Sequence, residues 1–183
     1  MKSAIEQLST YKSVHLNKNN LKTHFVGIPL IIWSIFVAFA TIRFQLPFQL
    51  PLLESNEISF ASLFVVLVMI YYFMLNIPLA LGHLLFMLPT LYFAEQMAMQ
   101  DNALWIAAAV FVVGWVFQFV GHYYEKAKPA FVDDLNQLLI GPYFLMAELF
   151  FMLGGLKKME QEVTKLAIDK RRIFENNKQA SSD

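Results

Sequence analysis

The sequence predicts an all-α polytopic integral membrane protein with four transmembrane helices and a fifth apolar segment that is re-entrant or oblique. Hydrophobic residues make up 57% of the 183 positions, and they gather in stretches long enough to cross the ~30 Å hydrocarbon core of a membrane as helices. Lys and Arg lie mainly outside these stretches and are concentrated toward both ends of the chain. Short connections marked by proline or asparagine separate the apolar stretches.

Composition and charge exclude several other classes of protein. The formal net charge is zero, whereas disordered chains combine low hydrophobicity with high net charge and nucleic-acid-binding domains usually carry a basic excess. The absence of cysteine excludes a disulfide-stapled domain, a cysteine-based zinc finger and an iron–sulfur protein. We expect no cleavable signal peptide, because the first apolar stretch starts late and is long for such a sequence.

Five apolar segments define the predicted architecture. The four predicted spans are residues 25–44, 58–77, 78–93 and 103–124. The fifth segment, 138–156, contains Gly141-Pro142, where a helix can break. We therefore predict one membrane-embedded domain over residues 1–156, beginning with an interfacial helix, and a charged cytoplasmic helix or tail over 157–183.

The predicted connections between these segments are short. Residues 45–57, with two prolines, predict a surface loop, and 95–102 predict a polar turn. Asn76-Ile77-Pro78 predicts a tight turn that makes a hairpin of the second and third spans. Residues 125–137 predict a polar connector, in which Pro129 disfavours helix at Lys128.

The distribution of Lys and Arg predicts the orientation in the membrane. If the N-terminus is cytoplasmic and the chain crosses four times, neither outer loop holds a Lys or an Arg, and only Arg43 lies near the outer side. All other basic residues are then cytoplasmic, provided that residues 138–156 do not cross. This condition is the reason for predicting a re-entrant or oblique fifth segment.

The predicted topology brings all four histidines to one membrane face. His15 and His24 precede the first span, His83 lies near the start of the third, and His122 lies at the end of the fourth. Neutral imidazole is the commonest side-chain metal ligand, and a histidine set without cysteine suits Fe, Zn, Cu or Ni better than Mg or Ca. The hypothesis is a metal site; the alternative for each histidine is an ordinary amphipathic role at the interface.

The spacing of the first two histidines predicts a break in the chain. Nine residues separate His15 from His24, which places them on opposite faces of one straight helix. The run Asn17-Lys18-Asn19-Asn20 favours a turn or cap. We therefore predict that a first short helix ends near His15 and a second starts near Asn20.

Polar neighbours of His122 support a site. Gln118 and Glu125 lie four residues before and three residues after His122, so all three share a helix face. Either side chain could orient His122, and Glu125 could itself be a ligand. The alternative for Glu125 is a solvated carboxylate at the helix end, near Lys126 and Lys128.

The fifth segment carries one ionisable residue, Glu148, within an apolar stretch. An ionisable group inside a membrane is costly and is a functional candidate for that reason. If the segment is re-entrant, Glu148 could instead simply reach water.

Together these residues resemble the signatures of one family. The motifs are Tyr11-x3-His15, Asn20-x3-His24-x2-Gly27-Ile28-Pro29, Gln118-Phe119-Val120-Gly121-His122-x2-Glu125-x3-Pro129-Ala130, and Leu138-Leu139-x-Gly141-Pro142 followed by Glu148. They resemble the membrane-embedded 2-hydroxy fatty acid dioxygenase family over about residues 8–150, nearly the whole apolar body. His83 lies in a less clearly patterned stretch.

The resemblance implies iron(II)-dependent α-oxidation, in which a 2-hydroxy long-chain fatty acid is cleaved with O2 to the acid one carbon shorter. It implies that Fe(II) is bound by the catalytic histidines His15, His24 and His122, with His83 as a fourth ligand or near neighbour. The residues expected around the ligands are Tyr11, Asn20, Gln118 and Glu125. The residues expected toward the substrate are Lys126, Lys128 and Glu148, although a solvated or lipid-phosphate role is the alternative for either lysine.

This chemistry suits a site at the cytoplasmic edge of a membrane. The acyl tail belongs in lipid and the 2-hydroxycarboxylate head at the interface, where its two oxygens can chelate iron and leave a position for O2. We expect a bacterial inner membrane, or the endoplasmic reticulum membrane if the chain is eukaryotic. The expected partners are the hydroxy acid, O2 and membrane lipid, with no nucleic acid; the sequence does not predict the oligomeric state.

Two other classes of function are compatible with parts of the pattern. A haem or electron-transfer protein would hold its cofactor between paired histidines. A non-enzymatic membrane scaffold or transporter would need none, although the small size and lack of repeats argue against a secondary transporter. Membrane hydroxylases and desaturases use clustered HxxHH-type boxes, whereas no two histidines here are closer than nine residues.

Overall fold

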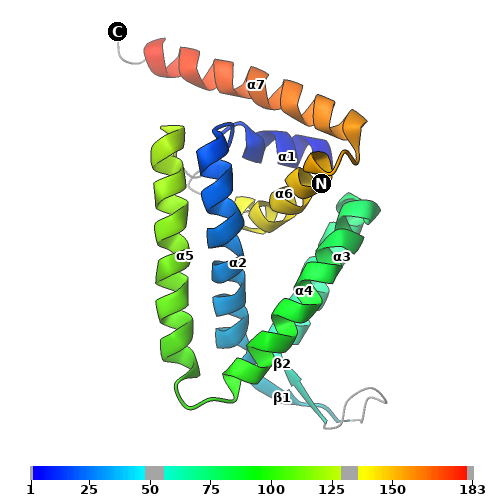
Figure 1. The fold of residues 1–183 in the computed structure, drawn as a ribbon. Helices are drawn as coiled ribbons and strands as arrows, with labels where there is room; N and C mark the ends of the chain where they lie inside the picture. The colour runs from blue at the N-terminus through cyan, green and yellow to red at the C-terminus, as the bar shows by residue number, and fades with distance from the viewer. Residues whose placement is uncertain (1, 48–55, 129–135, 181–183) are drawn as a thin grey trace. The chain divides into compact units, whose positions relative to one another are not determined.

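A computed structural model describes residues 2–47, 56–128 and 136–180 (Figure 1). In chain order the elements are α1 (Ala4–Lys12), α2 (Lys18–Ala40), β1 (Arg43–Gln45), β2 (Glu57–Ser59), α3 (Phe60–Leu75), α4 (Ile77–Ala98), α5 (Ala103–Glu125), α6 (Gln137–Met152) and α7 (Lys157–Ala180). They form two compact units. The first unit consists of Met1–Val26 and Phe117–Asp183, and the second unit consists of Gly27–Val116. Helices α2 and α5 each run from one unit into the other.

Three of the described helices are long and apolar enough to cross a membrane, namely α2, α4 and α5. Helices α3 and α6 are apolar but have only 16 residues each, which corresponds to about 24 Å at ~1.5 Å per residue and is less than the hydrocarbon thickness. The predicted total of four spanning helices therefore stays a prediction. Helix α6 continues through Pro142, so the helix does not break at Gly141-Pro142, where the sequence would allow a break. The re-entrant or oblique course of this segment stays a prediction.

In the second unit, α3 and α4 form the predicted hairpin around one asparagine. Asn76 ends α3 in an extended conformation, with φ −162°, and its side-chain oxygen accepts a hydrogen bond from Leu79 N at 3.1 Å. Pro78 follows in the first turn of α4, where its missing N–H costs no helical hydrogen bond. The tight turn predicted from these residues is confirmed.

A short antiparallel hairpin precedes α3, and it corrects the all-α expectation. Strands β1 and β2 pair in the register Arg43↔Ser59, Phe44↔Ile58 and Gln45↔Glu57. The first predicted span therefore ends too late and the second begins too early, because their terminal residues pair as strands instead of continuing the helices. Of the predicted loop 45–57, residues 48–55 lie outside the described part of the chain.

An ion pair joins this hairpin to α4. Arg43, the one basic residue near the predicted outer side, contacts Glu95 at 2.8 Å. The same carboxylate accepts hydrogen bonds from the hydroxyls of Ser59 and Ser62, and Ser59 also caps α3 by accepting a hydrogen bond from Ser62 N. These contacts give Arg43 a local partner at the end of the hairpin.

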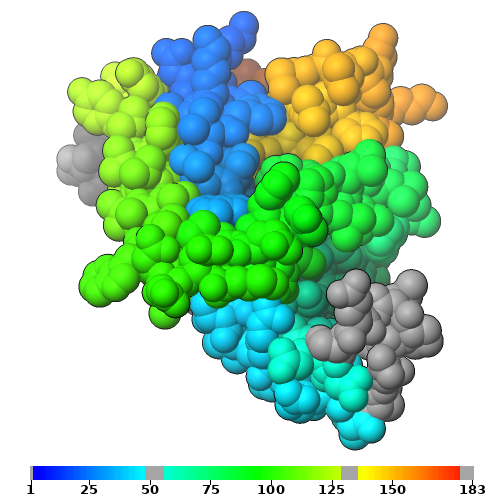
Figure 2. Space-filling view, turned by 60° about the horizontal axis from the view of Figure 1, so that its bottom comes forward, coloured from blue at the N-terminus to red at the C-terminus, as the bar shows by residue number. Residues whose placement is uncertain are grey.

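Exposed apolar side chains cover much of the second unit. On α3 and α4 they include Val66, Leu67, Ile70, Met74, Leu81, Leu85, Leu88 and Tyr92. Figure 2 shows the side chains of α4, in green, open to the surroundings on the face turned to the viewer. An apolar surface of this extent is typical of contact with lipid or with another protein, and the lengths of α2, α4 and α5 favour lipid.

The first unit is built around α1, which packs against both α6 and α7 (Figure 1). Its core includes Leu8 and Tyr11 from α1, Phe144 and Ala147 from α6, and Val163 and Ala167 from α7. Gly154, with φ +78°, ends α6 in the left-handed conformation that favours glycine. The charged helix predicted to begin at residue 157 is confirmed as α7, whereas the division of the chain into domains at residue 156 stays a prediction.

Candidate metal centre

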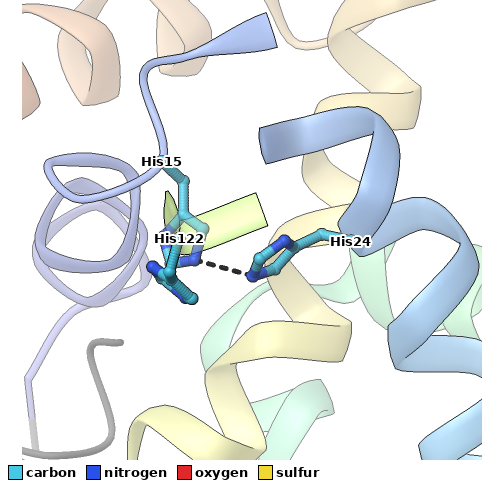
Figure 3. A group of neighbouring side chains, drawn as sticks. All are labelled: His15, His24 and His122. Atoms are coloured by element: carbon cyan, nitrogen blue, oxygen red, sulfur yellow. Dashed lines mark hydrogen bonds between the residues drawn. The ribbon is translucent and has the colours of Figure 1, made fainter. Parts of the chain in front are cut away.

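Three histidines from separate parts of the first unit converge on one point (Figure 3). His15 comes from the connection between α1 and α2, His24 from the second turn of α2, and His122 from the last turn of α5. All three are buried, and their ring centroids lie 4.6 to 5.0 Å apart. One ring nitrogen from each lies within 4.8 Å of the others, so the group can hold a metal ion.

The convergence depends on the chain reversal between α1 and α2. Helix α1 ends at Lys12 and α2 begins at Lys18, as predicted from the asparagine run. Asn17 caps α2, because its side-chain oxygen accepts a hydrogen bond from Asn19 N at 2.8 Å. The reversal turns His15 back toward His24, which a continuous helix would place on the opposite face.

Backbone carbonyls determine which nitrogen of two of the rings carries a proton. Nδ1 of His15 lies 2.6 Å from the Tyr11 carbonyl, and Nδ1 of His24 lies 3.0 Å from the Asn20 carbonyl. Because a carbonyl oxygen only accepts, Nδ1 must be the N–H in both rings. A neutral imidazole has one N–H, so each Nε2 carries a lone pair.

These two lone pairs point at each other. Nε2 of His15 lies 3.0 Å from Nε2 of His24, and two acceptors at this distance need a cation between them. A proton is a poor candidate, since burial and the neighbouring His24 and His122 hold the pKa of His15 well below 6.5. Two nitrogens that each bind one metal ion at ~2.1 Å and at a right angle are about 3.0 Å apart, so the donor set fits a metal ion.

Aromatic rings enclose the open side of His15. The Tyr11 ring stacks on His15 with centroids 4.0 Å apart and planes 3° from parallel, and Phe144 packs against Tyr11 at 4.9 Å. Burial raises the pKa of Tyr11, so its phenol is neutral at physiological pH. The Tyr11 ring therefore contributes an apolar wall, while its carbonyl orients the imidazole.

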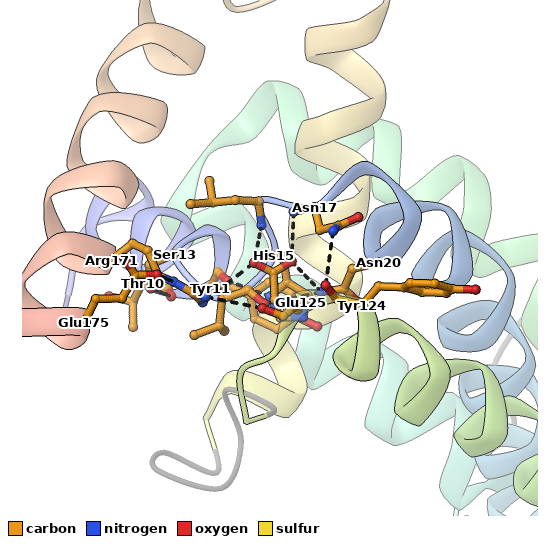
Figure 4. Close-up of polar contacts among 12 residues, drawn as sticks. Thr10, Tyr11, Ser13, His15, Asn17, Asn20, Tyr124, Glu125, Arg171 and Glu175 are labelled. Atoms are coloured by element: carbon orange, nitrogen blue, oxygen red, sulfur yellow. Dashed lines mark hydrogen bonds and ion pairs between the residues drawn. The ribbon is translucent and has the colours of Figure 1, made fainter. Parts of the chain in front are cut away.

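Glu125 joins the end of α5 to the start of α2 (Figure 4). Its two carboxylate oxygens accept hydrogen bonds from Leu16 N at 3.2 Å, Asn17 N at 2.8 Å and Asn20 Nδ2 at 3.1 Å. Its side chain is 4% exposed, so it is a buried carboxylate and not a solvated one. Glu125 therefore ties together the segments that carry His15, His24 and His122.

Two residues that were not among the predicted site residues also shape this centre. Arg171 of α7 donates a hydrogen bond from Nη2 to the Glu125 carbonyl at 3.2 Å and forms an ion pair with its carboxylate at 3.7 Å. Gly121 allows α5 to approach α2, because a Cβ there would overlap Thr23 Oγ1 and Asn20 Oδ1. Gly121 was visible as part of a motif, whereas nothing distinguishes Arg171 from its basic neighbours in the sequence.

Two other predicted site residues, His83 and Gln118, are also buried. His83 belongs to the second unit, where its buried ring contacts Tyr72 at 4.8 Å, and the three-histidine group forms without it. Neither ring nitrogen of His83 has a hydrogen-bond partner among the described residues. In the first unit, Gln118 is buried, and its Nε2 has no hydrogen-bond partner in the described part of the chain.

The charged candidates divide into buried and exposed residues. Glu148 forms an ion pair with Lys12, whose ammonium group also lies 5.6 Å from the centre of the Phe151 ring. Lys126 and Lys128 are exposed, and the backbone of Lys126 is left-handed, with φ 55°. Pro129 and Ala130 of the motif lie outside the described residues.

Comparisons with known proteins agree with the sequence motifs. Residues 1–153 match the model of a family described as 2-hydroxy-palmitic acid dioxygenase Mpo1-like. The 2-hydroxy-palmitic acid dioxygenase MPO1 of Saccharomyces cerevisiae is 32% identical over 162 residues, which cover 84% of this chain and 83% of the yeast protein. No solved structure matches the chain.

Proposed function

Because the chain belongs to the Mpo1-like family of 2-hydroxy-palmitic acid dioxygenases, we propose that it is a membrane dioxygenase of 2-hydroxy long-chain fatty acids. The proposed reaction cleaves the hydroxy acid with O2 to the acid one carbon shorter. The proposed cofactor is Fe(II), held by His15, His24 and His122. The proposed orientation has the N-terminus in the cytoplasm, as the distribution of Lys and Arg favours.

The observation that carries the proposal is the pair of facing lone pairs on His15 and His24. Their Nε2 atoms are 3.0 Å apart while both Nδ1 atoms face carbonyls, an arrangement that a bound cation stabilises. The adjacent His122 supplies a third imidazole. A nitrogen set with no thiolate suits iron, and three protein ligands leave positions open for other molecules.

When bound, Fe(II) would supply coordination of the hydroxycarboxylate head and reaction with O2. The protein's own part is to hold the ligands: the carbonyls of Tyr11 and Asn20 fix the N–H tautomer of two rings, as outer partners of metal-bound histidines generally do. The Tyr11 ring excludes water from one side of His15. The Nε2 group of Gln118 is a donor that a substrate oxygen can use.

Metal analysis and product analysis test the proposal together. The purified protein is loaded with Fe(II) under nitrogen, its metal content is measured, and it is incubated under air with 2-hydroxypalmitate. Lipid mass spectrometry then detects the acid one carbon shorter. We expect one metal per chain and this product, and we expect His15→Ala, His24→Ala and His122→Ala each to lose both.

His83→Ala separates the possible roles of the fourth histidine. If His83 is a fourth ligand, this variant should lose metal. If His83 lies outside the coordination sphere, the metal content should be unchanged. Wild-type protein that binds iron and yields no shortened acid at any chain length would contradict the proposed reaction. A Soret band in the purified protein would instead favour the haem alternative.

A further inference from the structure

A C-terminal helix outside the family match contacts the metal centre indirectly. The match ends at residue 153, and α7 begins at Lys157. Val163 and Ala167 of α7 are buried in the first unit, and Lys170 donates hydrogen bonds to Ser9 Oγ at 3.0 Å and to the Glu6 carbonyl at 3.2 Å. These contacts fix α7 on α1, so that the position of the next residue, Arg171, is well defined.

Arg171 makes one hydrogen bond and one ion pair with Glu125 at the end of α5. Its Nη2 donates to the Glu125 carbonyl at 3.2 Å, and its Nη1 lies 3.7 Å from the Glu125 carboxylate. A third nitrogen, Nε, donates to Glu175 at 2.7 Å, which holds the guanidinium in place from the other side. A lysine at this position has one charged nitrogen and cannot make these two hydrogen bonds and the ion pair with the same geometry.

The carboxylate of Glu125 needs a nearby cation for electrostatic reasons. It lies at the C-terminus of α5, where the partial negative charge of the helix disfavours an anion. Arg171 offsets this effect, and the backbone amides of Leu16 and Asn17 and the side-chain amide of Asn20 supply the hydrogen-bond donors. Without the guanidinium, a carboxylate that is almost fully buried loses its compensating charge.

A continuous series of contacts then leads from Arg171 to the ligands. Arg171 contacts Glu125, and Glu125 binds the amide of Leu16, the residue directly after His15. The same carboxylate binds the side chain of Asn20, whose carbonyl faces the Nδ1 atom of His24. Both rings of the facing pair thus depend on the placement of one carboxylate.

We propose that Arg171 is a positioning residue of the metal centre, acting through Glu125 on the connection that carries His15 and on Asn20. This proposal depends on one part of the proposed function, namely that the three histidines bind a metal ion. It assigns to α7 a role in tuning metal affinity, in a segment that the family match does not include.

Metal titration of the full-length protein in detergent tests the proposal. Co2+ serves as the probe, because its visible absorption reports coordination directly. We expect Arg171→Gln to weaken Co2+ binding by about tenfold, the size typical when a partner of the ligands is removed. Arg172→Gln is the matched control, since Arg172 is the exposed neighbour on the same helix, and it should bind Co2+ like the wild type. Arg171→Lys, which keeps the charge, should recover part of the loss.

A double-variant cycle tests whether Arg171 acts through Glu125. If it does, Glu125→Gln weakens Co2+ binding, and adding Arg171→Gln to it produces little further loss. Independent, additive losses would overturn the proposed route. Co2+ affinity of Arg171→Gln within twofold of the wild type would overturn the proposal itself.

Hydrogen exchange of the metal-free protein gives a readout that does not depend on metal or on activity. The amides of Leu16 and Asn17 should exchange faster in Arg171→Gln than in the wild type and in Arg172→Gln, because their acceptor is displaced. Unchanged exchange in residues 13–20 would contradict the positioning role even if the wild type bound no metal. Metal binding without the shortened acid would contradict only the proposed function.

Discussion

Nε2 of His15 lies 3.0 Å from Nε2 of His24, and each ring turns its Nδ1 toward a carbonyl of its own helix or helix end. In the absence of a cation this places two lone pairs face to face inside the protein. The same arrangement becomes favourable when one ion accepts both. The geometry therefore couples the stability of the first unit to metal binding.

Metal binding should raise the stability of the protein. A ligand that binds only the folded state at one hundred times its Kd stabilises it by about 2.7 kcal/mol, so added Fe(II) or Co2+ should raise the Tm of the metal-free protein. The measurement is thermal unfolding in detergent with and without the ion under nitrogen. His24→Gln should abolish the metal-dependent part of the shift, and an equal shift in that variant would place the ion elsewhere.

The stability of the metal-free protein should fall as the pH is lowered. The pKa of His15 in the folded state is held below 6.5, chiefly by burial, so the unfolded chain binds more protons than the folded one below this pH. The protein therefore keeps its full free energy of unfolding above pH 6.5 and loses part of it as the pH falls toward the folded-state pKa of His15. Unfolding midpoints measured between about pH 7.5 and pH 5.5 test this. His15→Gln, which removes the titrating ring, should show a shallower dependence.

Gly121→Ala should damage the metal centre without touching a ligand. The added methyl would overlap Thr23 Oγ1 and Asn20 Oδ1 and lie 3.0 Å from His24 Nδ1, so α5 must move away from α2. Overpacking of this kind costs about 1–3 kcal/mol, and displacement of His122 should weaken Co2+ binding about tenfold or more. Val120→Ala, at an exposed neighbouring position, is the control. Wild-type affinity in Gly121→Ala would show that α5 can shift without moving His122.

Much of the helical architecture, and the convergence of three of the four histidines, could be predicted because each rests on local signals. Apolar length located α2, α4 and α5, and the asparagine run located the reversal that brings His15 to His24. The β1–β2 pairing could not be seen, because three-residue strands at the ends of apolar helices carry no periodicity of their own.

The network around Glu125 could be predicted only in part, because only its local helical spacing is visible in the sequence. Helical spacing placed Glu125 on the same helix face as His122, but the backbone N–H groups that donate to its carboxylate lie about one hundred residues away, at Leu16 and Asn17. Arg171 lies in a helix where basic residues are frequent, so only the tertiary packing of α7 on α1 distinguishes it. Polar contacts between residues this far apart in the chain produce no spacing pattern in the sequence.

Breaking the Lys12–Glu148 pair should destabilise the protein. Both side chains are largely buried, at 13% and 9% exposure, and removal of one member of such a pair leaves an uncompensated charge. Lys12→Met should therefore lower the free energy of unfolding by about 3 kcal/mol, as measured by denaturant or thermal unfolding in detergent. Lys158→Met, at an exposed position of α7, controls for loss of a surface lysine.

The double variant Lys12→Met/Glu148→Leu separates a structural role of Glu148 from the predicted contact with substrate. Replacing both members by apolar residues should restore most of the stability. If the role of Glu148 is structural, the double variant keeps the wild-type KM for 2-hydroxypalmitate. A raised KM with restored stability would instead support a contact with the substrate.

Gln118→Leu should raise the KM for 2-hydroxypalmitate and leave metal affinity unchanged. The Nε2 group is buried without a hydrogen-bond partner among the described residues, so we expect it to donate to an oxygen of the bound hydroxy acid. Loss of a hydrogen bond to a charged group costs about 1.5–3 kcal/mol, or roughly tenfold in KM and more. Co2+ titration of the same variant decides the alternative: if metal affinity falls by as large a factor as KM rises, Gln118 orients His122 and does not bind substrate.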